Sequence, residues 1–194
     1  MKKYVSVFLV LLIILLCVSC GKKEHKIMDS RMSWGYYSNY NEALDAADLV
    51  VVGEVKNIGK THRYDIELHP YEGKVTIRPV YYTPVEIVIK EIIKGEYTES
   101  TVIYQALGGE IDNVIYDYTA TDTLSIRKNS EILVFLRITK PDLGYESISP
   151  GCAIIEDENG KAMQSLKGAE TTDSIEDMVY DIKLAKSKMN EVTE

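Results

Sequence analysis

The chain has 194 residues, of which 45% are hydrophobic, and carries 22 basic and 30 acidic side chains. This composition excludes a disordered or fibrous chain, because such chains lack the apolar residues that a core requires. The length suits one domain of roughly 100–200 residues, which is long enough to bury a core. The acidic excess argues against a nucleic-acid partner, since phosphate binding needs a basic surface.

The N-terminus has the pattern of an export signal. Lys2 and Lys3 precede twelve consecutive apolar residues at 7–18, and Ser19-Cys20 follows them. The apolar run is shorter than the ~20 residues that a membrane-spanning helix needs, so a transmembrane anchor is the weaker alternative. The segment resembles bacterial lipoprotein signals. That resemblance implies a signal peptide at 1–19, lipid on the thiol of Cys20 and a protein on the extracytoplasmic face of the cell membrane.

Lipidation would leave one free thiol in the mature chain. Cys17 departs with the signal, so Cys152 is the remaining candidate and no intramolecular disulfide is expected. Cys152 precedes the apolar Ala-Ile-Ile run, which favours a small buried side chain over a catalytic nucleophile. The mature chain would have 20 basic and 30 acidic side chains, a net charge of −10.

Residues 20–40 are polar and then aromatic, with no clear period, so we predict a lipid-anchored linker there. A helix is expected at 41–47, where Asn41 precedes acidic and helix-forming residues. The first core strand follows at 49–55, and Gly53 within it marks a bend or a close approach.

The rest of the domain is expected to be mainly β, because short β-branched runs alternate with turn signals. The change of register near residues 91–93 predicts a bulge in a strand that begins after Pro84. Residues 132–136 are apolar on both faces, as in a strand that is covered on both sides. Residues 110–124 are predicted to be irregular, and Asn159-Gly160 to be a hairpin turn. Further short strands are predicted at 101–107, 145–149 and 152–156.

Residues 60–82 are predicted to form a projecting hairpin between two core strands. The turn signal Pro70-Tyr71-Glu72-Gly73 separates two extended arms at 61–68 and 74–81. The insertion is longer than a simple connection needs, and long loops on a rigid scaffold usually carry function.

The tail changes to helical spacing. Ile175, Met178, Val179 and Ile182 share one face of a predicted amphipathic helix over 174–189, with Asp173 as its N-cap. We expect this helix to cover one end of the β structure, and a partner-binding helix is the alternative.

The order of these segments resembles the bacterial members of the netrin-like, tissue-inhibitor-of-metalloproteinases-like OB-fold group over roughly residues 41–166. The matching segments are 47–55 (ADLVVVGEV), 88–95 (VIKEIIKG), Gly108-Gly109, 131–136 (EILVFL), Tyr145 and Gly151. The resemblance implies an OB-fold-like Greek-key barrel within a domain at 41–194. The inhibitory chemistry of the animal proteins does not transfer, because Cys20 would be modified by lipid.

No metal or cofactor site is expected. His25, His62 and His69 have no ligand spacing, and His62 and His69 would point to opposite faces of one strand. No catalytic motif is recognisable.

Tyrosine is the unusual residue, with 14 Tyr against 2 Phe and 1 Trp. Its apolar ring and polar tip suit contact surfaces, although Tyr also closes the ends of small barrels. The predicted partner-binding residues are Trp34, Tyr36, Tyr37, Tyr64, Tyr71, Tyr81 and Tyr82.

The sequence therefore predicts a non-catalytic envelope lipoprotein that binds a protein or a glycan. One alternative is a lipid-tethered hydrolase that uses Cys152 or a carboxylate pair such as Asp112 and Asp117. The other is an accessory subunit of a membrane complex.

Overall fold

The structure is a computed structural model, and it describes residues 26–29, 37, 39–68, 75–118, 126–149, 152–156 and 174–192. Over these residues the protein is mainly β, with ten strands and two helices. The predicted signal peptide, the hairpin tip at 69–74 and the Asn159-Gly160 turn lie outside the described residues.

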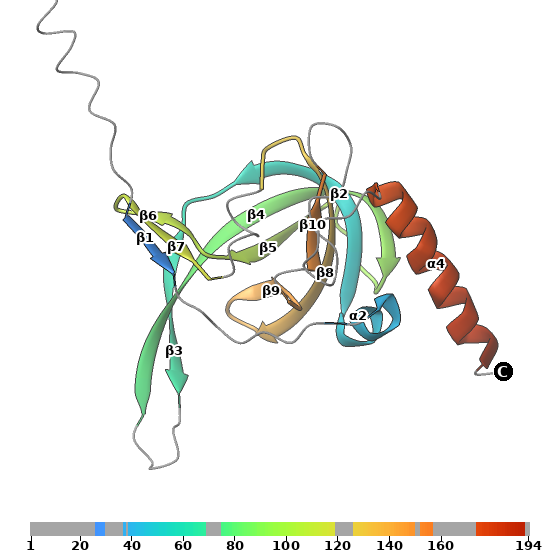
Figure 1. Cartoon of the computed structure of the whole chain (residues 1–194), viewed down its shortest axis with the longest axis horizontal. Helices are drawn as coiled ribbons and strands as arrows, with labels where there is room; N and C mark the ends of the chain where they lie inside the picture. Colours follow the sequence, from blue (N-terminus) through green and yellow to red (C-terminus); the bar gives the residue numbers. More distant parts are fainter. Residues whose placement is uncertain are drawn as a thin grey trace, which may run out of the picture.

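Five strands close into a ring (Figure 1). The first three strands along the chain pair antiparallel in succession, and the fourth pairs antiparallel with the first. The fifth strand is parallel to the third and antiparallel to the fourth, which completes the circuit. The members in chain order are β2 (Leu49–Ile58), β4 (Thr76–Lys94), β5 (Thr101–Leu107), β8 (Glu131–Lys140) and β9 (Gly144–Ser147).

Strand β8 separates two apolar clusters. Leu133 and Phe135 face a cluster that includes side chains from two helices, α2 (Tyr40–Ala46) and α4 (Ile175–Val192). Ile132, Val134 and Leu136 belong to the cluster formed by the ring strands. Besides β2 and β9, strand β8 also pairs with β10 (Ala153–Ile155), which lies antiparallel to it. Residues 132–136 are all fully buried, which confirms the prediction of a strand covered on both sides.

Both helices begin at side-chain caps. The Asn39 side chain accepts a 3.0 Å hydrogen bond from the Glu42 amide, so α2 begins earlier than the predicted residue 41. At α4, Ser174 Oγ accepts from the Asp177 amide at 3.1 Å and Asp177 accepts from the Ser174 amide at 3.2 Å. This capping box identifies Ser174, rather than the predicted Asp173, as the N-cap. The apolar side chains of α4 cluster with side chains from β2, β8 and β10, so α4 covers a face of the sheet rather than one end of the β structure.

The β2–β4 ladder is bent by bulges. The register skips Lys90 and Ile93 of β4, so the predicted change of register near 91–93 is confirmed. The backbone of β4 passes close to Gly53, where an added Cβ would collide with Ile87 Cγ2 and with the carbonyl oxygen of Val88. Only glycine leaves room for this approach.

Two sequence predictions are wrong here. The predicted linker contains β1 (Lys26–Asp29), and the supposedly irregular stretch contains β6 (Gly109–Ile111) and β7 (Val114–Asp117). These strands form a second sheet in the order β1-β7-β6, with β1 parallel to β7. Asp112 and Asn113 have φ of 52° and 63° and make a two-residue hairpin turn. Strands of three or four residues are too short to show a period.

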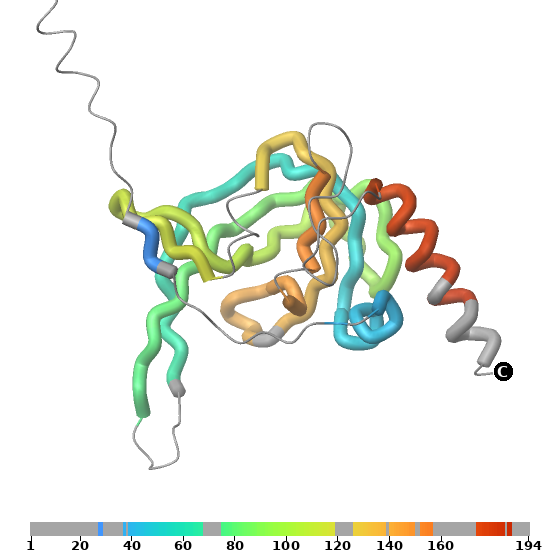
Figure 2. The backbone as a smooth tube through the Cα atoms, in the orientation of Figure 1, coloured from blue at the N-terminus to red at the C-terminus, as the bar shows by residue number. Residues whose placement is uncertain are grey.

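The predicted hairpin is present, but its second arm is not a separate strand. β3 (His62–Leu68) pairs with the first part of β4, and β4 then continues into the ring (Figure 2). Pro84 does not break β4. One edge of β4 pairs first with β3, up to Tyr82, and then with β2, from Val85. Pro84 lies in the gap between these two ladders, where its missing N–H costs no ladder hydrogen bond. The Pro84 carbonyl accepts from the Gly59 amide at 2.8 Å in the gap between the two ladders.

Candidate functional site

The β3–β4 hairpin extends beyond the ring as a two-stranded ribbon (Figure 1). Seven cross-strand pairs hold it together, from His62 opposite Tyr82 to Leu68 opposite Thr76. An isolated two-stranded ribbon is marginally stable in water, so its base needs support from the rest of the fold. Three of the predicted tyrosines lie at that base.

Tyr82 is part of the core at the ribbon's base. Its side chain is 4% exposed, and its hydroxyl donates a 2.7 Å hydrogen bond to Glu146 Oε1 on β9. Burial first, and then the hydrogen bond to the carboxylate, raise the pKa of Tyr82 above its ordinary value of 10.0. A side chain this deeply buried offers no surface to a partner, so the prediction of Tyr82 as a contact residue is corrected to a structural role.

Tyr64 bridges the ribbon to the turn between β8 and β9. Its hydroxyl donates a 2.7 Å hydrogen bond to Asp142, which raises the Tyr64 pKa. Lys140 Nζ lies 4.6 Å from the ring centroid, within the range of a cation–π contact. The Tyr64 and Tyr82 rings meet edge to face with centroids 6.2 Å apart. One face of the ribbon is therefore fixed to β9 and to the β8–β9 turn.

Tyr81 faces the other side of the ribbon. Its ring stacks on Tyr116 of β7 with centroids 3.6 Å apart and an interplanar angle of 19°. Its backbone amide donates a 3.1 Å hydrogen bond to the hydroxyl of Tyr118, a buried residue. Tyr116 and Tyr118 could not be predicted as supports from the sequence, because β7 was not predicted. A sharper signal would have been Asp112-Asn113, a residue pair that suits a two-residue hairpin turn.

The remaining predicted contact residues are not gathered at this site. Tyr37 is half-buried and packs against the cluster of α2 and α4 instead. Trp34, Tyr36 and Tyr71 lie outside the described residues. The structure thus brings together Tyr64, Tyr81 and Tyr82, and uses them to hold the ribbon rather than to present an aromatic surface.

The outward side chains of the ribbon are apolar and charged. Ile77 of β4 is 58% exposed, although it lies in a strand. On β3, Arg63 Nε lies 2.6 Å from Asp65 Oδ1. The exposed ion pair contributes little to stability, because water screens it. A rigidly based ribbon with exposed apolar and charged groups is suited to contact with another molecule. The sequence does not mark Ile77 as a contact residue, because an apolar residue in a strand predicts burial.

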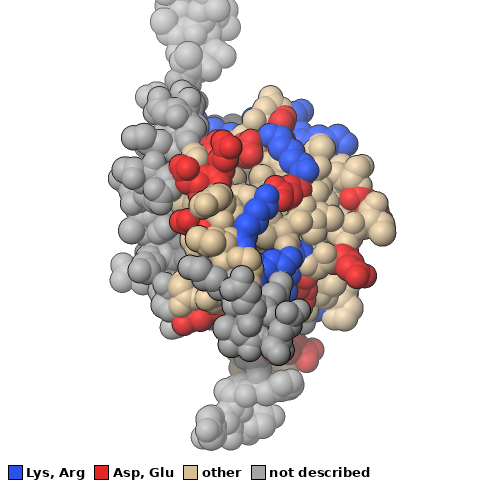
Figure 3. Space-filling view, turned by 90° about the vertical axis from the view of Figure 1, so that its right-hand side faces the viewer, with Lys and Arg blue, Asp and Glu red and all other residues tan. Residues whose placement is uncertain are grey.

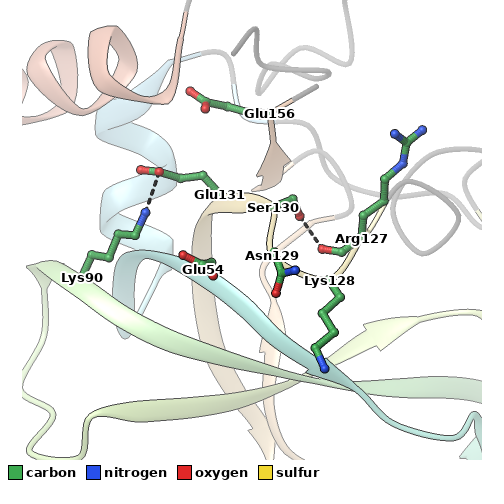
Figure 4. A pocket seen from close by; sticks show the side chains of 8 residues that line it. All are labelled: Glu54, Lys90, Arg127, Lys128, Asn129, Ser130, Glu131 and Glu156. Carbon is green, nitrogen blue, oxygen red and sulfur yellow. Dashed lines mark hydrogen bonds and ion pairs between the residues drawn. The ribbon is translucent and has the colours of Figure 1, made fainter. Parts of the chain in front are cut away.

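A second feature is a hollow of about 460 Å³ beside the β2–β8 ladder (Figure 4). Lys90 points to Glu131, with Nζ 2.8 Å from Oε2, and Glu156 accepts a 2.8 Å hydrogen bond from the Ile175 amide. Glu131, and to a smaller degree Glu54, raise the pKa of Lys90. The hollow is lined by three acidic and three basic side chains, so the negative charges of the glutamates are matched by positive charges. The hollow is lined by Glu54, Lys90, Arg127, Lys128, Asn129, Ser130, Glu131 and Glu156.

The residues of the alternative enzyme hypothesis are separated in the structure. Cys152 is 1% exposed in the apolar cluster that faces the helices, so its predicted burial is confirmed. Asp112 lies in the β6–β7 turn, whereas Asp117 ends β7 at its other end. Within the described ranges, no group of three or more His, Cys, Asp or Glu side chains is placed to hold a metal ion.

The face that carries α4 shows basic and acidic side chains interspersed among uncharged ones (Figure 3). Lys183 pairs with Glu91 at 2.6 Å, and Lys186 Nζ donates a 2.8 Å hydrogen bond to the Ile93 carbonyl. These contacts join α4 to the end of β4. In the part of the chain that the structure covers, neither helix has the length and apolar character required to cross a bilayer.

Comparisons with known proteins identify no relative of this chain. No protein-family model matches the chain, and no curated protein or solved structure matches it significantly.

Proposed function

We propose that the protein is a lipid-anchored, non-catalytic envelope protein whose OB-type barrel presents the β3–β4 hairpin to a protein or glycan partner. The anchor is lipid on Cys20. The single observation that carries the binding role is the ribbon itself, because the seven cross-strand pairs of β3 and β4 extend outward from the ring and are fixed at their base.

The OB-type assignment is supported by the order of pairing in the ring. Around the circuit the strands follow one another in the order β2, β4, β5, β9 and β8, so the last two are reversed relative to their order in the chain. Strands β2, β4 and β5 form an antiparallel meander, and β9 is parallel to β5. A five-stranded Greek-key ring of this kind is the arrangement of the OB barrel. Loops and hairpins at the ends of such barrels commonly carry the binding residues.

The binding role is favoured over the hydrolase alternative. A nucleophilic thiolate requires access to substrate and an activating environment. Cys152 instead packs among apolar side chains of α4 and β8. The accessory-subunit alternative shares the proposed architecture and differs only in the partner, so it is a special case of the same proposal.

The anchor is tested by metabolic labelling with a fatty acid. The wild-type protein should take up the label, and the Cys20→Ala variant should not. Equal labelling of the two proteins would contradict lipidation at Cys20.

The binding role is tested by shortening the ribbon beyond its supported base. Tyr64 and Val80 lie directly opposite each other, so an Asn-Gly turn can replace residues 65–79. The variant keeps Tyr64, Tyr81 and Tyr82, and it should therefore fold and reach the membrane normally. It should lose the partners that the wild type forms crosslinks with in intact envelopes. Retention of every partner would contradict a binding role for the hairpin.

A further inference from the structure

Strand β1 fixes the point at which the chain from the anchor enters the fold. Lys26 lies opposite Val114 and Asp29 opposite Asp117, so the whole of β1 is paired with β7. Only five residues separate Cys20 from Lys26. A fully extended chain advances at most ~3.6 Å per residue, so the Cα atom of Lys26 lies within about 22 Å of the Cα atom of Cys20. This distance is shorter than the diameter of a small domain, which is about 30 Å.

The β1-β7-β6 sheet is in turn held tightly to the ring. The Gly108 amide donates a 2.7 Å hydrogen bond to the Tyr81 carbonyl, and Tyr116 stacks on the Tyr81 ring. At Gly109, whose φ is 129°, an added Cβ would collide with the hydroxyls of Thr61 and Thr83. The sheet therefore cannot swing freely, and its position relative to the anchor sets the orientation of the domain.

We infer that the β1-β7-β6 sheet meets the lipid surface at its β1 edge, with α4 on the side of the domain away from the membrane. The inference rests on the proposed lipidation of Cys20. Ile27 and Met28 of β1 are 64% and 46% exposed, and among the described residues they are the exposed large apolar side chains nearest to the anchor along the chain. Single exposed apolar residues are common, but these two project from opposite faces of β1, the edge strand of its sheet, so the edge beside the tether is apolar on both sides. Helix α4 lies across the ring from β1 (Figure 1).

Electrostatic attraction does not determine this orientation. Lys22, Lys23 and Lys26 would favour anionic headgroups. Glu110 and Asp112, which are exposed on β6 and in its turn, would oppose them. The short tether and the apolar side chains of β1 are therefore the dominant factors, and the orientation should depend little on salt.

The orientation narrows the class of partner for the hairpin. Tyr81 at the ribbon's base stacks directly on β7, the central strand of the sheet that meets the membrane at β1. The base of the ribbon is thus held near the bilayer. A partner that meets it is a membrane protein or a molecule that lies close to the membrane surface.

The test uses the full-length lipidated protein in vesicles of phosphatidylglycerol and phosphatidylethanolamine that contain a quencher in the headgroup region. A fluorophore is attached to Ile27→Cys, and to Tyr180→Cys on α4 as a control of matched exposure, 64% against 68%. The native Cys152 is buried and the Cys20 thiol carries lipid, so labelling is confined to the introduced cysteine. A second variant, Met28→Cys, repeats the measurement on β1.

The label on Ile27→Cys should be quenched severalfold more than the label on Tyr180→Cys, and its emission should shift to the blue. Met28→Cys should behave like Ile27→Cys. Equal quenching at β1 and α4 in protein whose lipid is confirmed by mass spectrometry would overturn the orientation and leave the anchor intact. Absence of lipid on Cys20 would overturn the anchor and the orientation together.

Discussion

The hydroxyl of Tyr82 donates a 2.7 Å hydrogen bond to the carboxylate of Glu146, and this contact ties the base of the hairpin to β9. Because β9 closes the ring between β5 and β8, the bond links the ribbon to the strand that completes the circuit. The projecting hairpin and the closure of the ring are therefore coupled through two side chains.

Tyr82→Phe should lower the free energy of unfolding by about 1.5–3 kcal/mol, because the charged Glu146 loses its donor in a partly buried place. Urea denaturation measures this change. Tyr180→Phe is the matched control, and its loss should stay within about 0.5 kcal/mol because Tyr180 is exposed. Equal effects of the two substitutions would show that the Tyr82 bond does not support the fold.

The pKa of Tyr82 also predicts a dependence on alkaline pH. Its pKa in the folded state is raised above the ordinary 10.0. The associated stabilisation is therefore fully present below about pH 10 and is lost as the pH rises toward the folded-state pKa. The free energy of unfolding should fall more steeply above pH 10 in the wild type than in Tyr82→Phe. Parallel pH profiles would contradict the raised pKa.

Gly53→Ala should destabilise the ring, because the new Cβ collides with the Val88 carbonyl and with Ile87 across the ladder. Overpacking of this kind costs about 1–3 kcal/mol. Asn57→Ala, at an exposed position of the same strand, provides the control and should change stability by no more than about 0.5 kcal/mol. If Gly53→Ala unfolds at the wild-type denaturant concentration, β4 does not approach Gly53 as closely as described.

Cys152 should react slowly with a thiol reagent in the native protein and quickly after unfolding, because its side chain is 1% exposed. The measurement is made on a shortened protein of residues 21–194, in which Cys152 is the single cysteine. Rapid native labelling at neutral pH would indicate an accessible thiolate and would favour the hydrolase alternative.

The sequence predicted the elements whose burial leaves a pattern. The β-branched run of β2, the doubly covered β8 and the amphipathic α4 were all expected, because each has a long apolar stretch or a clear period. Gly53 was expected to mark a close approach, and the contact with Val88 explains why.

The short outer strands could not be predicted in the same way. β1 and β7 have four residues each and β6 has three, so none is long enough to show alternation. Their stability comes from pairing with one another and from the Tyr81–Tyr116 stack, both of which are tertiary effects. For the same reason the sequence placed Tyr82 on the surface, although the contacts with Glu146 and Tyr64 bury it. Pro84 suggested a break in β4, because the change of partner strand at that point is not visible in the sequence.

The most direct test of the binding role is site-specific photocrosslinking in intact cells. A photoreactive amino acid replaces Ile77 on the ribbon, and in a control protein it replaces Ile103 on β5, which is similarly exposed at 53% against 58%. Position 77 should give discrete adducts, whose mass falls after treatment with glycan-degrading enzymes if the partner is a glycan, and position 103 should give none. The same adducts from both positions, or adducts from position 103 alone, would contradict binding through the hairpin.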